Sequence, residues 1–230
     1  MVLYPLHPLY QGEPLIWIDA HPDINTDKTT VTGNIHGMPV AALLGLGEPS
    51  LTHFLDDSIK LKSGNIVMLG LRDIDPPEAE ILKEHHIRYY KWDYIMEHGL
   101  QNCLNESIDY LSHCPAVHVS FDIDSMDPKL MPGVSVPVPE GFNEDDVFLM
   151  MDELLTRLPV QAMDLIHKKD RLPLVHAQSL FAFPPLPPYL LPHRSIDLGK
   201  LCLRCVGDHL CNGSLAGSRR AIKDYGSQLI

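Results

Sequence analysis

Short apolar stretches alternate with segments of helical character from about residue 15 to residue 166. A parallel sheet requires this order, because each strand must be followed by a crossover, usually a helix, before the next strand begins. Strands covered on both faces are also almost continuously apolar, as these stretches are. The pattern predicts strands over residues 15–19, 65–71, 87–91, 116–122 and 160–166.

Three segments between these strands carry helix signals. Residues 76–84 open with two prolines, which are accepted in the first turn of a helix. Apolar side chains recur at helical spacing over residues 100–111, and Asn143 is suited to cap a helix that continues to about residue 155. The sequence therefore predicts an α/β fold with three layers, α-β-α, around a parallel sheet.

The character of the chain changes after Ile166. Residues 183–188 run Phe-Pro-Pro-Leu-Pro-Pro, and proline both fixes φ and removes a backbone donor. We therefore divide the chain into an α/β domain, residues 1–166, and a divergent tail, residues 167–230. We expect the tail to be irregular and residues 184–201 to contribute no strand to the central sheet.

Net charge excludes some classes of partner. The formal charge is −12, with 18 Lys and Arg against 30 Asp and Glu. Nucleic-acid binders neutralise phosphates with clustered cations, so we expect no nucleic-acid partner. No apolar run approaches the ~20 residues that span a bilayer, and the five Cys do not suggest a secreted disulfide framework. We expect a cytoplasmic protein with no membrane partner.

The first string that carries chemistry follows the first expected strand. Asp19, His21 and Asp23 stand at alternate positions. In an open α/β sheet, ligands bind beyond the carboxyl ends of the strands, where these side chains lie. Carboxylate and imidazole ligands suit Mn²⁺, but an ordinary turn at the end of a strand explains this one string equally well.

A second acidic string follows the fourth expected strand. Asp122 and Asp124 are two residues apart, so they share one face of an extended chain and can reach one ion. Acids packed this closely repel each other, and divalent cations are the simplest compensation. Two such strand ends favour a metal site over two ordinary turns.

Four motifs in order resemble the ureohydrolase family. They are Asp-Ala-His-Pro-Asp at 19–23, Gly-Asn-Ile-His-Gly at 33–37, Gly-Leu-Arg-Asp-Ile-Asp-Pro-Pro-Glu at 70–78 and Ser-Phe-Asp-Ile-Asp-Ser-Met-Asp-Pro at 120–128. The second string is more similar to arginases than to agmatinases. The resemblance covers about residues 12–166 and implies a three-layer fold that is incomplete at the N-terminus.

The resemblance implies a hydrolase that converts L-arginine to ornithine and urea at a binuclear manganese centre. Two metal ions would lower the pKa of a shared water near neutral pH. The implied metal ligands are Asp19, His21, Asp23, Asp122 and Asp124. His36 would be the catalytic proton shuttle. The implied substrate-binding residues are His21, Asn25, Thr32, Asn34, Asp75 and Glu78.

Two departures from the family pattern affect the expected activity. The family's first metal ligand, a His in a Gly-Gly-Asp-His-Ser string, is not found upstream of Asp19, and His167 stands where the family has a glutamate that orients the guanidinium. We therefore expect one of the two Mn²⁺ sites to be weakened and the activity to be impaired. An agmatinase-type hydrolase and a non-catalytic, metal-binding interaction fragment remain alternatives. By resemblance, a homotrimer or homohexamer is also expected.

Overall fold

A computed structural model describes residues 14–53, 56–166 and 202–206. Its centre is a parallel sheet with the strand order β3-β2-β1-β4-β5-β6. The strands are β1 Leu15–Ile18, β2 Ile66–Leu71, β3 Arg88–Lys91, β4 Val117–Asp122, β5 Val160–Ile166 and β6 Cys202–Val206. The first five agree with the sequence prediction to within one residue.

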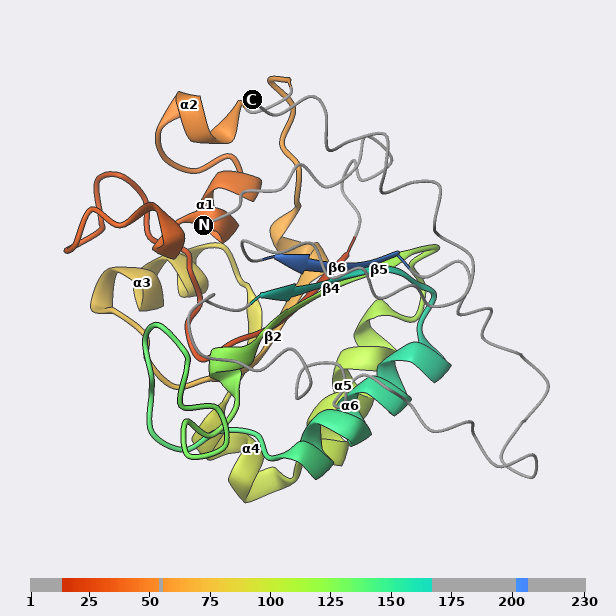
Figure 1. The fold of residues 1–230 in the computed structure, drawn as a ribbon. Coiled ribbons are helices and arrows are strands. Elements are labelled where there is room, and N and C mark those ends of the chain that lie inside the picture. The colour runs from red at the N-terminus through yellow and green to blue at the C-terminus, as the bar shows by residue number, and fades with distance from the viewer. Residues whose placement is uncertain (1–13, 54–55, 167–201, 207–230) are drawn as a thin grey trace, which may run out of the picture.

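Helices cover both faces of this sheet (Figure 1). One face carries α4 Trp92–His98, α5 Leu100–Leu111 and α6 Glu144–Arg157. The other face carries α1 Pro39–Leu43, α2 Pro49–Thr52 and α3 Pro76–Glu84. The three-layer α/β prediction is therefore confirmed, including the helices expected over residues 76–84 and 100–111.

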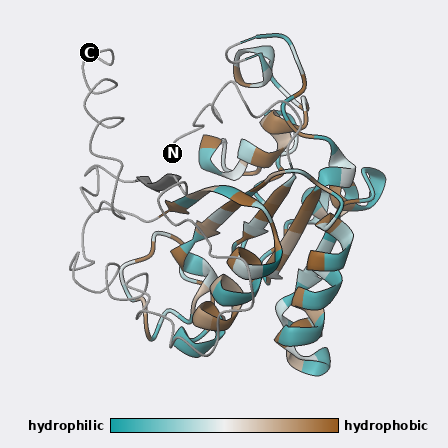
Figure 2. Ribbon diagram, turned by 90° about the vertical axis from the view of Figure 1, so that its right-hand side faces the viewer, coloured by the Kyte–Doolittle hydropathy of each residue, from teal (hydrophilic) through white to brown (hydrophobic). Residues whose placement is uncertain are grey.

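Each face of the sheet has its own apolar core. Because successive strand residues point to opposite faces, Ile16 and Ile18 pack toward α5 and α6, whereas Leu15 and Trp17 pack toward α1 and α3. In Figure 2 the strands are predominantly hydrophobic in colour, while the helices carry both colours. Burial of these alternating side chains is what holds β1 in its register between β2 and β4.

Strand β6 departs from the expectation of an irregular tail at Cys202–Val206, the part of the tail that the structure describes. It pairs in parallel with β5, with Ala162 opposite Cys202 and Ile166 opposite Val206. Its position depends on pairing with the edge of β5, a non-local interaction that a local pattern does not reveal. The expectation for residues 184–201 lies outside the described residues. Within the described part, no helix is long and apolar enough to cross a membrane.

Candidate metal centre

Two neighbouring strands deliver acidic residues to the same edge of the sheet. Ile18, at the end of β1, is in register with Phe121 of β4. The residues that follow, Asp19 and Asp122, therefore stand at the same level at the carboxyl ends of the strands. A short 3-10 helix, η3 Ile123–Ser125, comes directly after β4 and contains Asp124.

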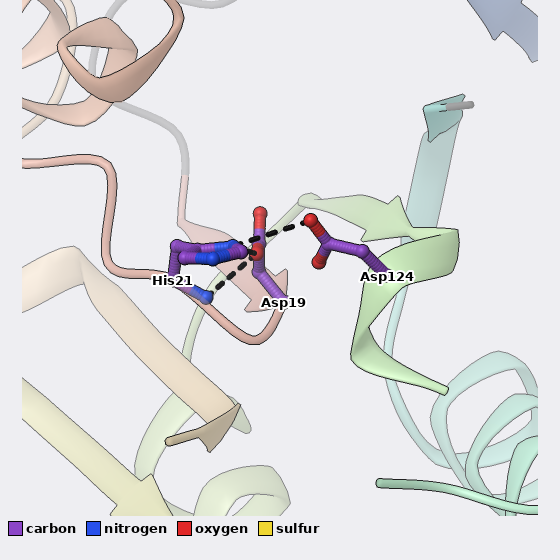
Figure 3. A group of neighbouring side chains, drawn as sticks. All are labelled: Asp19, His21 and Asp124. Atoms are coloured by element: carbon purple, nitrogen blue, oxygen red, sulfur yellow. Dashed lines mark hydrogen bonds and ion pairs between the residues drawn. The ribbon is translucent and has the colours of Figure 1, made fainter. Parts of the chain in front are cut away.

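Asp19, His21 and Asp124 form a compact group (Figure 3). One ligand atom from each of them lies within 4.8 Å of the others. The Nδ1 atom of His21 is 3.3 Å from Oδ1 of Asp19 and 3.2 Å from Oδ2 of Asp124. The backbone N–H of His21 also donates to Asp19 Oδ1 at 2.7 Å. Two segments far apart in the chain thus meet at one point. Ala20 and Asp124, which are 104 positions apart, are also joined here, because the backbone N–H of Ala20 donates to Asp124.

The acids of this group are crowded together, and their pKa values reflect it. Burial, followed by the charge of Asp124, raises the pKa of Asp19 well above its ordinary value. Burial and the neighbouring carboxylates also raise the pKa of Asp122. Burial opposes a charge on His21, but hydrogen bonds to Asp124 and Asp19 outweigh it and raise the pKa of His21 to about 11. The imidazole proton therefore supplies positive charge at the position where a cation would lie.

The donor set fits a divalent metal ion. In an octahedral site, two neighbouring donor atoms that each lie ~2.1 Å from the ion are ~3.0 Å from each other. The distances from Nδ1 of His21 to the nearest carboxylate oxygens of Asp19 and Asp124 are close to that donor–donor separation. The Nε2 atom of His21 is buried and has no hydrogen-bond partner. Whether Nε2 carries a proton or a lone pair, one nitrogen of the ring is therefore left without a hydrogen bond. Carboxylate and imidazole donors suit Mn²⁺, Zn²⁺ or Fe²⁺ and are not the thiolate set of a structural zinc site.

The other two expected ligands, Asp23 and Asp122, are near this group but not part of its compact core. Asp23 interacts electrostatically with His21, Asp122 and Asp124, and burial raises its pKa well above the ordinary value. Its φ is 49°, an uncommon left-handed conformation that aspartate tolerates better than most residues. An oxygen of Asp122 accepts the backbone N–H of Asp124 at 2.9 Å, which fixes the turn into η3. Their roles as ligands stay predictions.

Side chains that the sequence analysis did not single out hold this edge together. Trp17 donates through Nε1 to the backbone oxygen of His21 at 3.0 Å. Arg72, directly after β2, donates to several backbone oxygens of the segment that follows β4, among them that of Asp124. Arg72 lies inside the quoted 70–78 motif, but its partners are backbone atoms, which no residue pattern identifies.

Asn25, Asp75 and Glu78, three of the expected substrate-binding residues, lie next to one another. Asn25 is buried and donates through Nδ2 to Asp75 at 3.1 Å. Glu78 is also buried, and its carboxylate accepts the backbone N–H groups of Ile24 at 3.2 Å and Asp75 at 3.0 Å. Glu78 therefore has a structural role at the start of α3, as acids in the first turn of a helix often do.

The remaining site residues lie on an exposed loop. Thr32 accepts the backbone N–H of Asn34 at 3.2 Å, and His36 belongs to the 3-10 helix η1 Ile35–Gly37. All three side chains are exposed. Among the described residues, no hydrogen bond joins them to Asp19, His21 or Asp124. The structure thus gathers the metal-binding candidates without bringing the proposed proton shuttle into contact with them.

The fold and the site together define an α/β protein with a candidate metal site of two acids and an imidazole at the carboxyl edge of a parallel sheet. A family model described as "Arginase family" matches residues 7–167. The chain belongs to the arginase family.

Individual relatives agree with this assignment. The arginase of Bacillus subtilis is 40% identical over 145 residues, which cover 63% of this chain and 49% of the relative. The crystal structure of that organism's arginase superposes with a TM-score of 0.67 at 35% identity, covering 72% of this chain and 57% of the other. Entamoeba histolytica arginase, solved in complex with L-ornithine, has a TM-score of 0.64 at 31% identity, with 68% and 53% of the chains covered. The chain spans about half the length of the curated relatives it matches.

Proposed function

We propose that this chain is a manganese-dependent hydrolase that cleaves the guanidino group of L-arginine to give ornithine and urea. The observation that carries the proposal is the group formed by Asp19, His21 and Asp124 at the carboxyl edge of the sheet. Membership of the arginase family supports the substrate, because the relatives are named arginases and one was solved with L-ornithine.

In this proposal five side chains hold the metal. Asp19, His21 and Asp124 form the site whose donor atoms are already gathered. Asp23 and Asp122 would be the other two ligands that this chain supplies to the binuclear centre, one site of which is expected to be weaker. When bound, two Mn²⁺ ions supply Lewis acidity that makes a water molecule acidic near neutral pH. The chain itself contributes a preorganised set of ligands, of which Asp19 is buried and His21 and Asp124 are partly buried, and the His21 proton would be lost when a cation enters.

The polar loop and the start of α3 would bind the amino-acid end of the substrate. Asn25, Thr32 and Asn34 offer hydrogen-bonding groups for the α-carboxylate, and Asp75 offers an acceptor for the α-amino group. Glu78 would act through Asp75, because its carboxylate already accepts the backbone N–H of that residue. His21, which lies between the metal-binding acids and Asp73, would border the substrate.

His36 would deliver a proton to the leaving amine. A general acid contributes about 10²–10⁴-fold when it reaches the proton acceptor. His36 is exposed on η1, so its imidazole is accessible to a substrate bound at this edge of the sheet.

Urea release separates this proposal from its rivals. The purified chain is incubated with Mn²⁺ and either L-arginine or agmatine, alongside Asp124→Asn and the control Asp127→Asn. Asp127 belongs to the same segment but accepts a backbone N–H of Lys129 instead of joining the metal group. We expect release from L-arginine by the wild type and Asp127→Asn only, at a rate below that of Bacillus subtilis arginase because His167 replaces an acid.

Each other outcome identifies an alternative. Faster release from agmatine would favour an agmatinase-type hydrolase, since that substrate lacks the α-carboxylate that Asn25, Thr32 and Asn34 are proposed to bind. Mn²⁺ binding without urea from either substrate would favour a metal-binding interaction fragment. Release unaffected by Asp124→Asn would contradict the proposed site.

A further inference from the structure

Arg72 connects the two segments that carry the metal-binding group. Its backbone N–H donates to the backbone oxygen of Ala20 at 2.9 Å, between Asp19 and His21. Its side chain reaches the other segment, where Nη2 donates to the backbone oxygen of Asp124 at 2.7 Å. Arg72 is therefore hydrogen-bonded directly to both segments that carry the site, the one after β1 and the one after β4.

The guanidinium group of Arg72 is enclosed by backbone oxygens. In addition to Asp124, Nη2 donates to Met126 at 3.2 Å and Val138 at 3.3 Å, Nη1 to Ser125 at 3.0 Å and Gly70 at 3.3 Å, and Nε to Pro139 at 3.2 Å. The guanidinium offers five N–H donors in one plane to these six oxygens, so one N–H of Nη2 is shared between two of them, whereas the ammonium of lysine has three donors at a single point. Hydrogen bonds from a charged donor are also stronger than those between neutral groups.

The charge of Arg72 also lies near the acids of the site. Burial lowers the pKa of Arg72 below its ordinary value, and the charges of Asp124, Asp19, Asp127 and Glu140 oppose this by stabilising the guanidinium cation. Its hydrogen bonds go to backbone oxygens, so it leaves the carboxylate oxygens of Asp19 and Asp124 available for a metal ion. A residue that bonded those carboxylates directly would compete with the metal.

We propose that Arg72 is a positioning residue for the metal centre: its guanidinium fixes the backbone of residues 124–126 so that Asp124 meets Asp19 and His21. This inference rests on the proposed function, because it assigns Arg72 to the binding of the same metal. Residues that orient metal ligands typically change metal affinity by about 10–100-fold when they are replaced.

The test compares Arg72→Lys with the wild type and with Arg157→Lys. Arg157 is a matched control, because its guanidinium bonds the side chains of Glu153 and Asn105, on α6 and α5. Mn²⁺ is titrated into each protein, and the free ion is followed by electron paramagnetic resonance. We expect Arg72→Lys to bind Mn²⁺ at least about 10-fold more weakly than the wild type, and Arg157→Lys to bind it equally well.

A second readout needs no metal. Amide hydrogen exchange of the metal-free proteins is measured by mass spectrometry on peptides that contain residues 122–126. Arg72→Lys should exchange faster there, with unchanged protection in α5 and α6, because the carbonyl anchor is lost while the helices are not. Equal Mn²⁺ affinity and equal exchange in Arg72→Lys and the wild type would overturn the inference. If the wild type binds no Mn²⁺, the proposed function and this inference both fail.

Gly141→Ala tests the same contact if Arg72→Lys does not fold. A Cβ at Gly141 would lie 2.5 Å from the backbone oxygen of Ser125 and 2.8 Å from Nη2 of Arg72. The substitution therefore disturbs the contact between the guanidinium and the backbone of residues 125–126 from the backbone side, while the charge of Arg72 is kept; the φ of +122° at Gly141 adds backbone strain. We expect weaker Mn²⁺ binding in this variant too, and unchanged affinity would count against the positioning role.

Discussion

The strand-end acids and the loop over residues 26–37 differ in how the chain holds them. Asp19 is buried, and Asp124 is held by backbone hydrogen bonds at an edge fixed by the register of β1 and β4. Thr32 and His36 are exposed, and Thr32 accepts the backbone N–H of Asn34 within the same loop. The candidate metal group is therefore built into the sheet, whereas these loop side chains face solvent. We expect substitutions in the first region to affect metal binding and those in the second to affect turnover.

Removing a strand-end acid should have the largest effect. Asp124→Asn eliminates one of the two carboxylates that flank His21. We expect Mn²⁺ affinity to fall by more than the ~10–100-fold typical of groups that only support a ligand, and urea production to be lost with it. The measurement is a Mn²⁺ titration on the variant and on Asp127→Asn. Equal loss in both variants would show that general disturbance of the segment, not ligation, is responsible.

A substitution in the loop should give the opposite result. His36→Asn is expected to lower kcat for L-arginine by about 10²–10⁴-fold, the usual contribution of a general acid. Mn²⁺ affinity and thermal stability should not change, because His36 is exposed and outside the compact group. Steady-state kinetics with a parallel metal titration check this. A loss of Mn²⁺ affinity in His36→Asn would remove the distinction between the two regions.

Sequence reasoning located the strand-end group because its position follows from local patterns. Parallel strands over residues 15–19 and 116–122 place Asp19 and Asp124 at the same edge of the sheet; that β1 and β4 are neighbours follows from the structure. It did not locate Arg72, whose partners are backbone oxygens, or β6, whose pairing with β5 is non-local. It also could not place His36 relative to the metal, because a loop's position depends on tertiary contacts that its own residues do not specify.

Glu78 tests whether an expected substrate residue is chiefly structural. Glu78→Ala leaves the buried N–H groups of Ile24 and Asp75 without their acceptor. Each unsatisfied donor costs about 1–3 kcal/mol, and in a domain of this size ~1 kcal/mol lowers Tm by about 2–4 °C. Thermal unfolding should therefore show a clear loss of stability, whereas the exposed control Glu80→Ala should show almost none. Unchanged stability with a raised KM would assign Glu78 to substrate binding instead.

The smallest expected effect is the pH dependence of the metal-free protein. The pKa values of Asp19, Asp122 and His21 are all raised. A group whose pKa is higher in the folded than in the unfolded protein stabilises the fold fully at pH values below its unfolded pKa. That contribution is lost as pH rises through its pKa in the folded protein. Stability of the metal-free protein should therefore fall as pH rises from 6.5, the ordinary pKa of histidine, towards about 11, the pKa of folded His21. The raised pKa values of Asp19 and Asp122 extend this fall to lower pH, where Asp122→Asn should reduce the slope. Denaturant unfolding at several pH values measures this; a rise in stability over that range would contradict it.

We propose above that the chain binds Mn²⁺ at the edge of the sheet formed by Asp19, His21 and Asp124. The most direct test is a count of tightly bound Mn²⁺ per chain after metal loading and removal of free ion, made on the wild type and on Asp124→Asn. We expect one tightly held Mn²⁺ ion per wild-type chain and none in Asp124→Asn. No retained Mn²⁺ in the wild type, or equal retention in both proteins, would contradict it.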